Sequence, residues 1–80
     1  MKTKKYRRAA ISYEPKINSE HPFRITILEK DSELLGLAVM KIIKTMFFET
    51  EKEALDFARG YKVSRISRAL NMKDAKNENA

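Results

Sequence analysis

The sequence has no cysteine and a single histidine, His21. Without cysteine there are no disulfides, no thiolate nucleophile and no cysteine-ligated zinc site. His21 stands beside Pro22 with no second histidine or cysteine to join it, so we expect a solvated loop residue and not a ligand or a base. Because Ser, His and Asp occur at no recognisable catalytic spacing, we expect neither an enzyme nor a cofactor.

Long hydrophobic runs are also missing. The longest mostly apolar stretch, residues 34–48, is interrupted by Lys41, Lys44 and Thr45 and is too short to span a bilayer. At the N-terminus, Ala9-Ala10-Ile11 follows the basic residues where a secretory signal would have a longer apolar segment. We therefore expect a soluble protein that does not insert into membranes, and the lack of cysteine fits a cytoplasmic location.

Basic residues, in contrast, are abundant and segregated. Seventeen Lys and Arg against eleven Asp and Glu give a net charge of +6 on 80 residues. Ten of the cations stand in two runs without any acid: Lys2, Lys4, Lys5, Arg7 and Arg8, and then Arg59, Lys62, Arg65, Arg68 and Lys73. Charge gathered in this way attracts polyanions. The sequence therefore indicates nucleic acid or an acidic protein or ribonucleoprotein surface as the partner.

Eighty residues make one domain, with a core that is only just large enough without disulfides or metal. Alternation of apolar and polar residues predicts two strands, near residues 5–14 and 23–30. The polar residues 29–33 suit a hairpin turn after the second strand.

The stretch from Leu34 to Phe48 fits either a helix or a strand. Its polar residues fall within one arc of a helical wheel, whereas Val, Ile and Phe are good strand formers. The residues that follow favour a strand. Thr50 and Glu53 match the capping box Thr-x-x-Glu, so a helix near 51–59 begins directly afterwards, and a strand leads into a capped helix through a connection this short. We expect a third strand near 38–48.

Beyond this helix the pattern becomes weaker. Gly60 suits the left-handed residue that ends a helix. Residues 63–71 carry apolar side chains at helical spacing and predict a short second helix, although residues 61–66 also fit a brief strand. Residues 72–80 have no apolar anchor and are expected to form a disordered tail.

The expected fold is α+β, with a three-stranded antiparallel sheet packed by one capped helix, a short second helix and a disordered C-terminal tail. Residues 1–71 form the single domain, with a basic N-terminal arm. The expected core contains Phe23, Ile25, Ile27, Leu55 and Phe57. Helix capping and dipole compensation explain the acids at the helix start, Glu49, Glu51, Glu53 and Asp56, so we expect no metal there.

Residues 41–58 resemble the last strand and helix start of the AP2-like integrase N-terminal domains, which bind arm-type DNA sites. The shared signature is Phe-x-Thr-x-x-Glu-Ala, here Phe48, Thr50, Glu53 and Ala54. Members of that family read DNA with a three-stranded sheet backed by one helix. The resemblance thus implies a DNA-binding sheet. We assign none of the family's DNA-reading residues to positions of this sequence.

Two functions follow as hypotheses. The first is a small nucleic-acid-binding module, with Tyr6 and Tyr61 placed to stack bases beside the cations. The expected phosphate contacts are Arg7, Arg8, Arg24, Lys41, Lys44, Arg59, Lys62, Arg65 and Arg68. The alternative is a small phage-type protein-binding inhibitor of host machinery, for example an anti-CRISPR. Steep salt dependence would indicate the first function.

Overall fold

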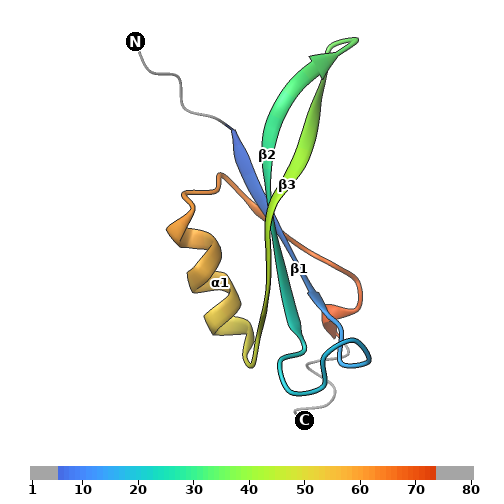
Figure 1. The fold of residues 1–80 in the computed structure, drawn as a ribbon, viewed down its shortest axis with the longest axis vertical. Helices are drawn as coiled ribbons and strands as arrows, with labels where there is room; N and C mark the ends of the chain where they lie inside the picture. Colours follow the sequence, from blue (N-terminus) through green and yellow to red (C-terminus); the bar gives the residue numbers. More distant parts are fainter. Residues whose placement is uncertain (1–5, 74–80) are drawn as a thin grey trace.

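The structure, a computed structural model, describes residues 6–73 (Figure 1). Its elements are the strands β1 (Arg7–Tyr13), β2 (Phe23–Leu34) and β3 (Leu37–Phe48), the helix α1 (Glu51–Gly60) and the short strand β4 (Ile66–Arg68). They form one sheet in the order β3-β2-β1-β4. β1 and β3 pair antiparallel with β2, whereas β4 runs parallel to β1. The α+β class is confirmed, but the sheet is four-stranded and mixed, not three-stranded and antiparallel.

The core lies between α1 and one face of the sheet. Ile11, Ile25 and Ile27 are fully buried at its centre, and α1 contributes the buried Ala54 and Ala58. Small alanines let the helix approach the three isoleucines closely, and larger side chains seal the edges of this contact. Of the five expected core residues, Phe23, Ile25 and Ile27 are buried, and Leu55 and Phe57 are partly buried against the cluster.

The start of α1 confirms the capping box. The Thr50 hydroxyl accepts from the Glu53 backbone N–H at 3.2 Å, and the Thr50 N–H donates to the Glu53 carboxylate at 3.3 Å. The expected end of the helix is wrong in its detail. Gly60 is the last helical residue, and Lys62, two positions later, is the one with positive φ, at 58°. The backbone N–H groups of Tyr61 and Lys62 close the helix on the carbonyls of Ala58 and Arg59.

The expected second helix at 63–71 is also wrong, because residues 66–68 of this segment join the sheet as β4, slightly later in the chain than the brief strand that residues 61–66 also fitted. The Ala9 N–H donates to the Arg65 carbonyl at 3.0 Å, and the Ala69 N–H donates to the Ile11 carbonyl at 2.9 Å. Helical spacing of a few apolar residues is a local signal, and β1 offers this segment backbone partners more than 50 positions away in sequence. Tertiary pairing therefore overrides the local pattern.

The core extends past the expected domain boundary at residue 71. Met72, assigned from sequence to the tail, is 2% exposed and packs in the core. Just before it, the Asn71 side chain accepts from the Tyr13 N–H at 3.1 Å and donates to the Tyr13 carbonyl at 2.9 Å. This amide completes the backbone pairing of β1 where β4 has ended. The remaining expected tail, residues 74–80, lies outside the described residues.

β2 and β3 form a long hairpin that projects past the rest of the molecule, and the overall dimensions are 47 × 25 × 19 Å (Figure 1). The expected turn at residues 29–33 is wrong, because these residues continue β2 through an irregularity between Lys30 and Ser32. The chain turns at Leu35 and Gly36, both with positive φ, between the paired Leu34 and Leu37. Positive φ at both central residues is the type I′ arrangement, which matches the twist of the two strands.

Candidate nucleic-acid interface

The nine cations predicted from sequence fall into two groups. Five make ion pairs within the fold: Arg7, Arg24, Lys41, Arg59 and Arg68. The other four make no ion pair within residues 6–73: Arg8, Lys44, Lys62 and Arg65. A cation that already faces a carboxylate gains less from a phosphate, so the second group holds the better candidates.

Arg7 is bound into the fold on several sides. Its Nε donates to the Glu29 carboxylate at 2.9 Å, and its Nη1 donates to the Tyr61 carbonyl at 3.1 Å. The guanidinium carbon also lies 5.9 Å from the centre of the Tyr61 ring. The Glu29 side chain is only 11% exposed. Arg7 therefore neutralises a nearly buried acid and holds the end of α1 against β1 and β2. Its guanidinium group lies over the Tyr61 ring.

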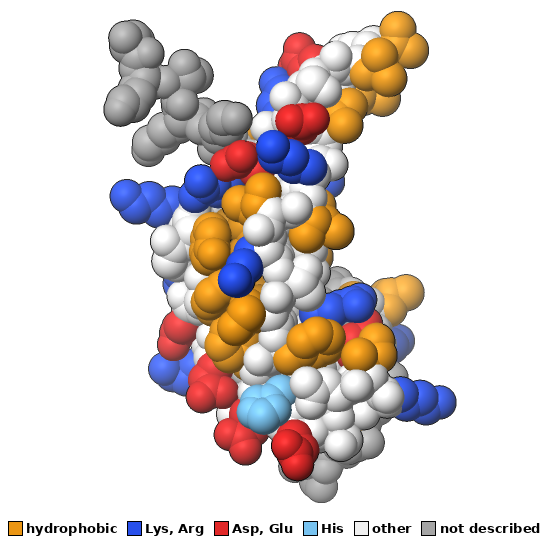
Figure 2. All heavy atoms as spheres, in the orientation of Figure 1, with side chains coloured by type: hydrophobic (Ala, Val, Ile, Leu, Met, Phe, Trp, Pro, Cys, Tyr) orange, Lys and Arg blue, Asp and Glu red, His pale blue; other side chains and the backbone are white. Residues whose placement is uncertain are grey.

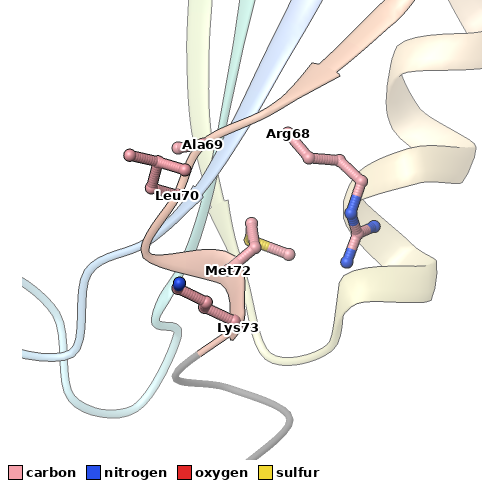
Figure 3. A pocket seen from close by; sticks show the side chains of 5 residues that line it. All are labelled: Arg68, Ala69, Leu70, Met72 and Lys73. Atoms are coloured by element: carbon pink, nitrogen blue, oxygen red, sulfur yellow. The ribbon is translucent and has the colours of Figure 1, made fainter.

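The other four paired cations link neighbouring elements or cover the surface. Arg68 of β4 pairs with Glu51 in the first turn of α1, and its side chain points toward the helix (Figure 3). Arg24 meets Glu14 at 3.1 Å across the start of the β1–β2 connection. The remaining two, Arg59 with Asp56 and Lys41 with Asp31, are exposed pairs that contribute little to stability.

The sheet face opposite α1 is not covered by any described element. Residues that pair across neighbouring strands point to the same side of a sheet, and successive residues of a strand point to opposite sides. The open face therefore consists of the residues that alternate with the buried isoleucines, together with their partners on the other strands. One row across the four strands consists of Thr45, Thr26, Ala10 and Ser67, and the next contains Ile42, Leu28 and Arg8. The first of these rows has only small or hydroxyl side chains, whereas the rows on either side also carry larger groups, such as Leu28 on one side and Arg24 and Phe47 on the other. The hydroxyls of the first row are therefore available to a polar partner that lies along it.

Two arginines that have no acidic partner within the described part of the chain lie side by side on this open face. Arg8 belongs to β1 and projects on the side opposite Ala9 and Ile11. Arg65 immediately precedes β4, and the hydrogen bond from Ala9 N–H to its carbonyl sets it next to Arg8 in the parallel pairing. Lys62 stands in the same connection between α1 and β4. The structure thus places Arg8 and Arg65 side by side at one end of β1, with Lys62 in the connection that leads to Arg65.

Lys44 does not belong to this group. It is paired with Ile27, which places it on the α1 side of the sheet and on the outer strand β3. Sequence reasoning also missed the hydroxyl residues of the open face, Ser12, Thr26, Thr45 and Ser67. Their alternation with buried residues in β1 and β2 was the signal that could have found them, because it separates the two faces of each strand.

No further chemical site is evident in residues 6–73. No three of their His, Asp and Glu side chains form a cluster that would hold a metal ion. None of the helical segments described has the length and hydrophobicity needed to cross a membrane. An open hollow is lined by Arg68, Ala69, Leu70, Met72 and Lys73, all from one continuous segment (Figure 3). A hollow formed by one segment brings no distant functional groups together.

Arg8 and Arg65, with Lys62 in the adjoining connection, present cationic hydrogen-bond donors of the kind that bind anions. Comparison of the chain with models of protein families, with curated proteins and with solved structures finds no match.

Proposed function

We propose that the protein binds nucleic acid through a basic surface formed by Arg8, Lys62 and Arg65 on and beside the open face of the sheet. The observation that carries the proposal is the adjacency of Arg8 and Arg65 without an acidic partner within residues 6–73. Two like charges held side by side repel each other, and a bound phosphate relieves that repulsion while accepting hydrogen bonds from both guanidinium groups.

The surroundings of this pair support a nucleic acid over a small anion. The pair borders a row of small and hydroxyl side chains that runs across all four strands, Thr45, Thr26, Ala10 and Ser67. Hydroxyls donate to phosphate and sugar oxygens, which supplies contacts that do not depend on base sequence. The net charge of +6 adds attraction at longer range.

The proposal also draws on the order of elements, which follows the pattern expected from the resemblance to AP2-like integrase domains. β3 leads into α1 through the capping box, and α1 packs on one face of the three antiparallel strands. The opposite face is left open, as a sheet that reads DNA requires. β4 and the length of the β2–β3 hairpin are additions to the expected pattern.

Fluorescence anisotropy with labelled duplex and single-stranded oligonucleotides tests the proposal. The double variant Arg8→Glu/Arg65→Glu lowers the net charge from +6 to +2, since each substitution changes the charge by two. We expect it to bind at least about tenfold more weakly. We also expect a shallower salt dependence, with the slope of log affinity against log salt reduced by about 0.9 for each duplex phosphate that the variant no longer neutralises.

A matched control separates local contacts from overall charge. Lys16→Glu/Lys52→Glu also lowers the net charge to +2, but both lysines are exposed and lie away from the arginine pair. This control should retain most of the affinity. Equal reductions in affinity in both variants would mean that only total charge matters. Absence of binding by the parent protein at low salt would reject the nucleic-acid proposal and favour an acidic protein surface, as the phage-type inhibitor hypothesis requires.

A further inference from the structure

The far end of the β2–β3 hairpin carries apolar side chains that nothing in the described structure covers. We call residues 30–42 the hairpin arm. Tyr6, just before β1, accepts a hydrogen bond from Lys30 N–H through its carbonyl, and beyond this point the described structure continues as two strands only. The exposed apolar residues are Leu34 at 65%, Leu35 at 94%, Leu37 at 72%, Val39 at 39% and Ile42 at 64%. Figure 2 shows hydrophobic side chains gathered at this end.

An arm of this kind is poorly suited to stand alone. A two-stranded ribbon is at best marginally stable in water and needs a third strand or another surface to cover it. Every arm residue except Lys30 and Met40 is exposed. Five aliphatic side chains at the end of such a ribbon form the kind of patch that marks an interaction surface.

Leu35 makes the strongest case for a binding role. Its φ is 53°, in a region where a leucine is strained and where Asn, Asp or Gly is preferred in a type I′ turn. It is also the most exposed large apolar residue of the molecule's described part. Leucine at this position therefore benefits neither the turn nor the core, and its apolar side chain is free to contact a partner.

The charges of the arm indicate which partner fits. The arm contains two lysines and two acids, so its net charge is zero although the whole chain has +6. They pair within the arm, Lys30 with Glu33 at 2.9 Å and Lys41 with Asp31 at 3.6 Å. An arm without net charge gains no long-range attraction to nucleic-acid phosphates or to anionic lipid headgroups. A neutral, apolar surface instead matches another neutral, apolar surface.

We propose that the hairpin arm is a self-association surface, and that its occupant is the arm of a second copy of this chain. A twofold interface requires a patch that complements itself, and an aliphatic patch without net charge meets this condition. Because the arm projects along the 47 Å axis, arms can meet while the basic bodies that repel each other stay apart.

Contact through a face of the arm is favoured over contact through its edge. Leu34 pairs with Leu37 and Ser32 with Val39, so three apolar side chains share one face. The edge strand β3 carries Lys41, and the irregularities in its pairing with β2 disturb a straight edge. Both features hinder strand addition. The arm has thirteen residues, fewer than the 20–30 per side of a standard interface. The dimer should therefore be weak and concentration-dependent.

Sedimentation equilibrium of the full chain without nucleic acid, from micromolar to millimolar concentration, tests this proposal. We expect the average mass to rise from that of the monomer toward twice that value. The variant Leu34→Asp/Leu37→Asp places two charges on the shared face and should raise the dissociation constant at least tenfold. The matched control Ile17→Asp/Leu70→Asp changes two exposed aliphatic residues outside the arm and should associate like the parent.

Circular dichroism checks that the arm variant is folded. If it is not, Leu35→Asn provides a second test, because asparagine suits the turn while removing the apolar side chain. A parent protein that stays monomeric to millimolar concentration would overturn the proposal and leave the arm to a different partner. Equal association of the arm variant and the parent would also overturn it. The test is independent of nucleic-acid binding, since Arg8→Glu/Arg65→Glu should still associate.

Discussion

Arg7 and Glu29 form an ion pair of 2.9 Å in which the acid is almost buried and the arginine is about one-third exposed. They are directly paired residues of β1 and β2. The same guanidinium donates to the Tyr61 carbonyl and lies over the Tyr61 ring. One side chain from the N-terminal basic run thus joins two strands to the end of α1, which makes Arg7 a structural residue and separates it from its neighbour Arg8.

Replacing Arg7 should therefore affect stability more than binding. Arg7→Ala removes a charged hydrogen-bond donor from Glu29, and we expect a loss of about 1–3 kcal/mol in the free energy of unfolding. Arg8→Ala, the adjacent control on the open face, should stay within about 0.5 kcal/mol of the parent. Urea denaturation followed by circular dichroism measures both. Equal stability of the two variants would contradict a structural role for Arg7.

The three central isoleucines should dominate the stability of the core. Ile25 is fully buried, whereas Ile42 on the neighbouring strand β3 is 64% exposed. Ile25→Ala creates a cavity and should cost about 2–5 kcal/mol, a large part of the total for so small a domain. Ile42→Ala, the same change at an exposed position, should cost less than about 1 kcal/mol. Thermal unfolding of both variants at low concentration makes the comparison.

The capping box at α1 should contribute measurably through one hydroxyl. Thr50→Ala removes the acceptor for the Glu53 N–H and should reduce stability by about 1 kcal/mol. Thr50→Ser keeps an oxygen at the same place and should be nearly neutral. If both variants melt at the same temperature, the cap does not stabilise the native helix.

Local sequence signals account for much of this fold. Alternation located β1 and residues 23–30 of β2, and the capping box located the start of α1 within the chain. The capping box also favoured a strand over a helix for β3. It places the start of α1 so soon after residue 48 that two consecutive helices would need a very tight turn between them. Each of these signals depends on residues within about five positions of one another, where the physical cause is local.

The predictions failed where the structure of a segment depends on residues that are distant in the sequence. β4 forms because β1 lies beside it, and Arg7 and Arg68 find their acids 22 and 17 positions away. No spacing rule reveals such partners in a single sequence, so the sequence could not separate the cations that pair within the fold from Arg8, Lys44, Lys62 and Arg65. The turn at Leu35 and Gly36 is a different case. Gly36 could have indicated the turn from the sequence. The polar residues 29–33 have a composition more typical of turns, and the turn was therefore predicted there.

Asn71 should hold the end of β1 through its amide. Asn71→Ala loses both hydrogen bonds to the Tyr13 backbone, and we expect a cost of about 1–2 kcal/mol. Asn71→Asp keeps an acceptor for the Tyr13 N–H but loses the donor to its carbonyl. Hydrogen exchange of the Tyr13 amide gives a local readout. Protection should fall in the alanine variant and be partly retained in the aspartate variant, and unchanged protection in both would exclude this contact.

Leu35 should show a conflict between stability and association. Leu35→Asn places a residue that tolerates positive φ in the turn and should stabilise the hairpin by about 0.5–1 kcal/mol. The same change removes the most exposed apolar side chain of the arm, so self-association should weaken. Leu35→Met, which retains an apolar side chain without improving the turn, is the matched control and should associate like the parent. Thermal unfolding and sedimentation of both variants give the two readouts.

If Leu35→Asn is more stable than the parent but associates more weakly, the leucine at this position serves binding and not folding. If Leu35→Asn associates as strongly as Leu35→Met, the Leu35 side chain takes no part in self-association, which contradicts the proposal for the hairpin arm.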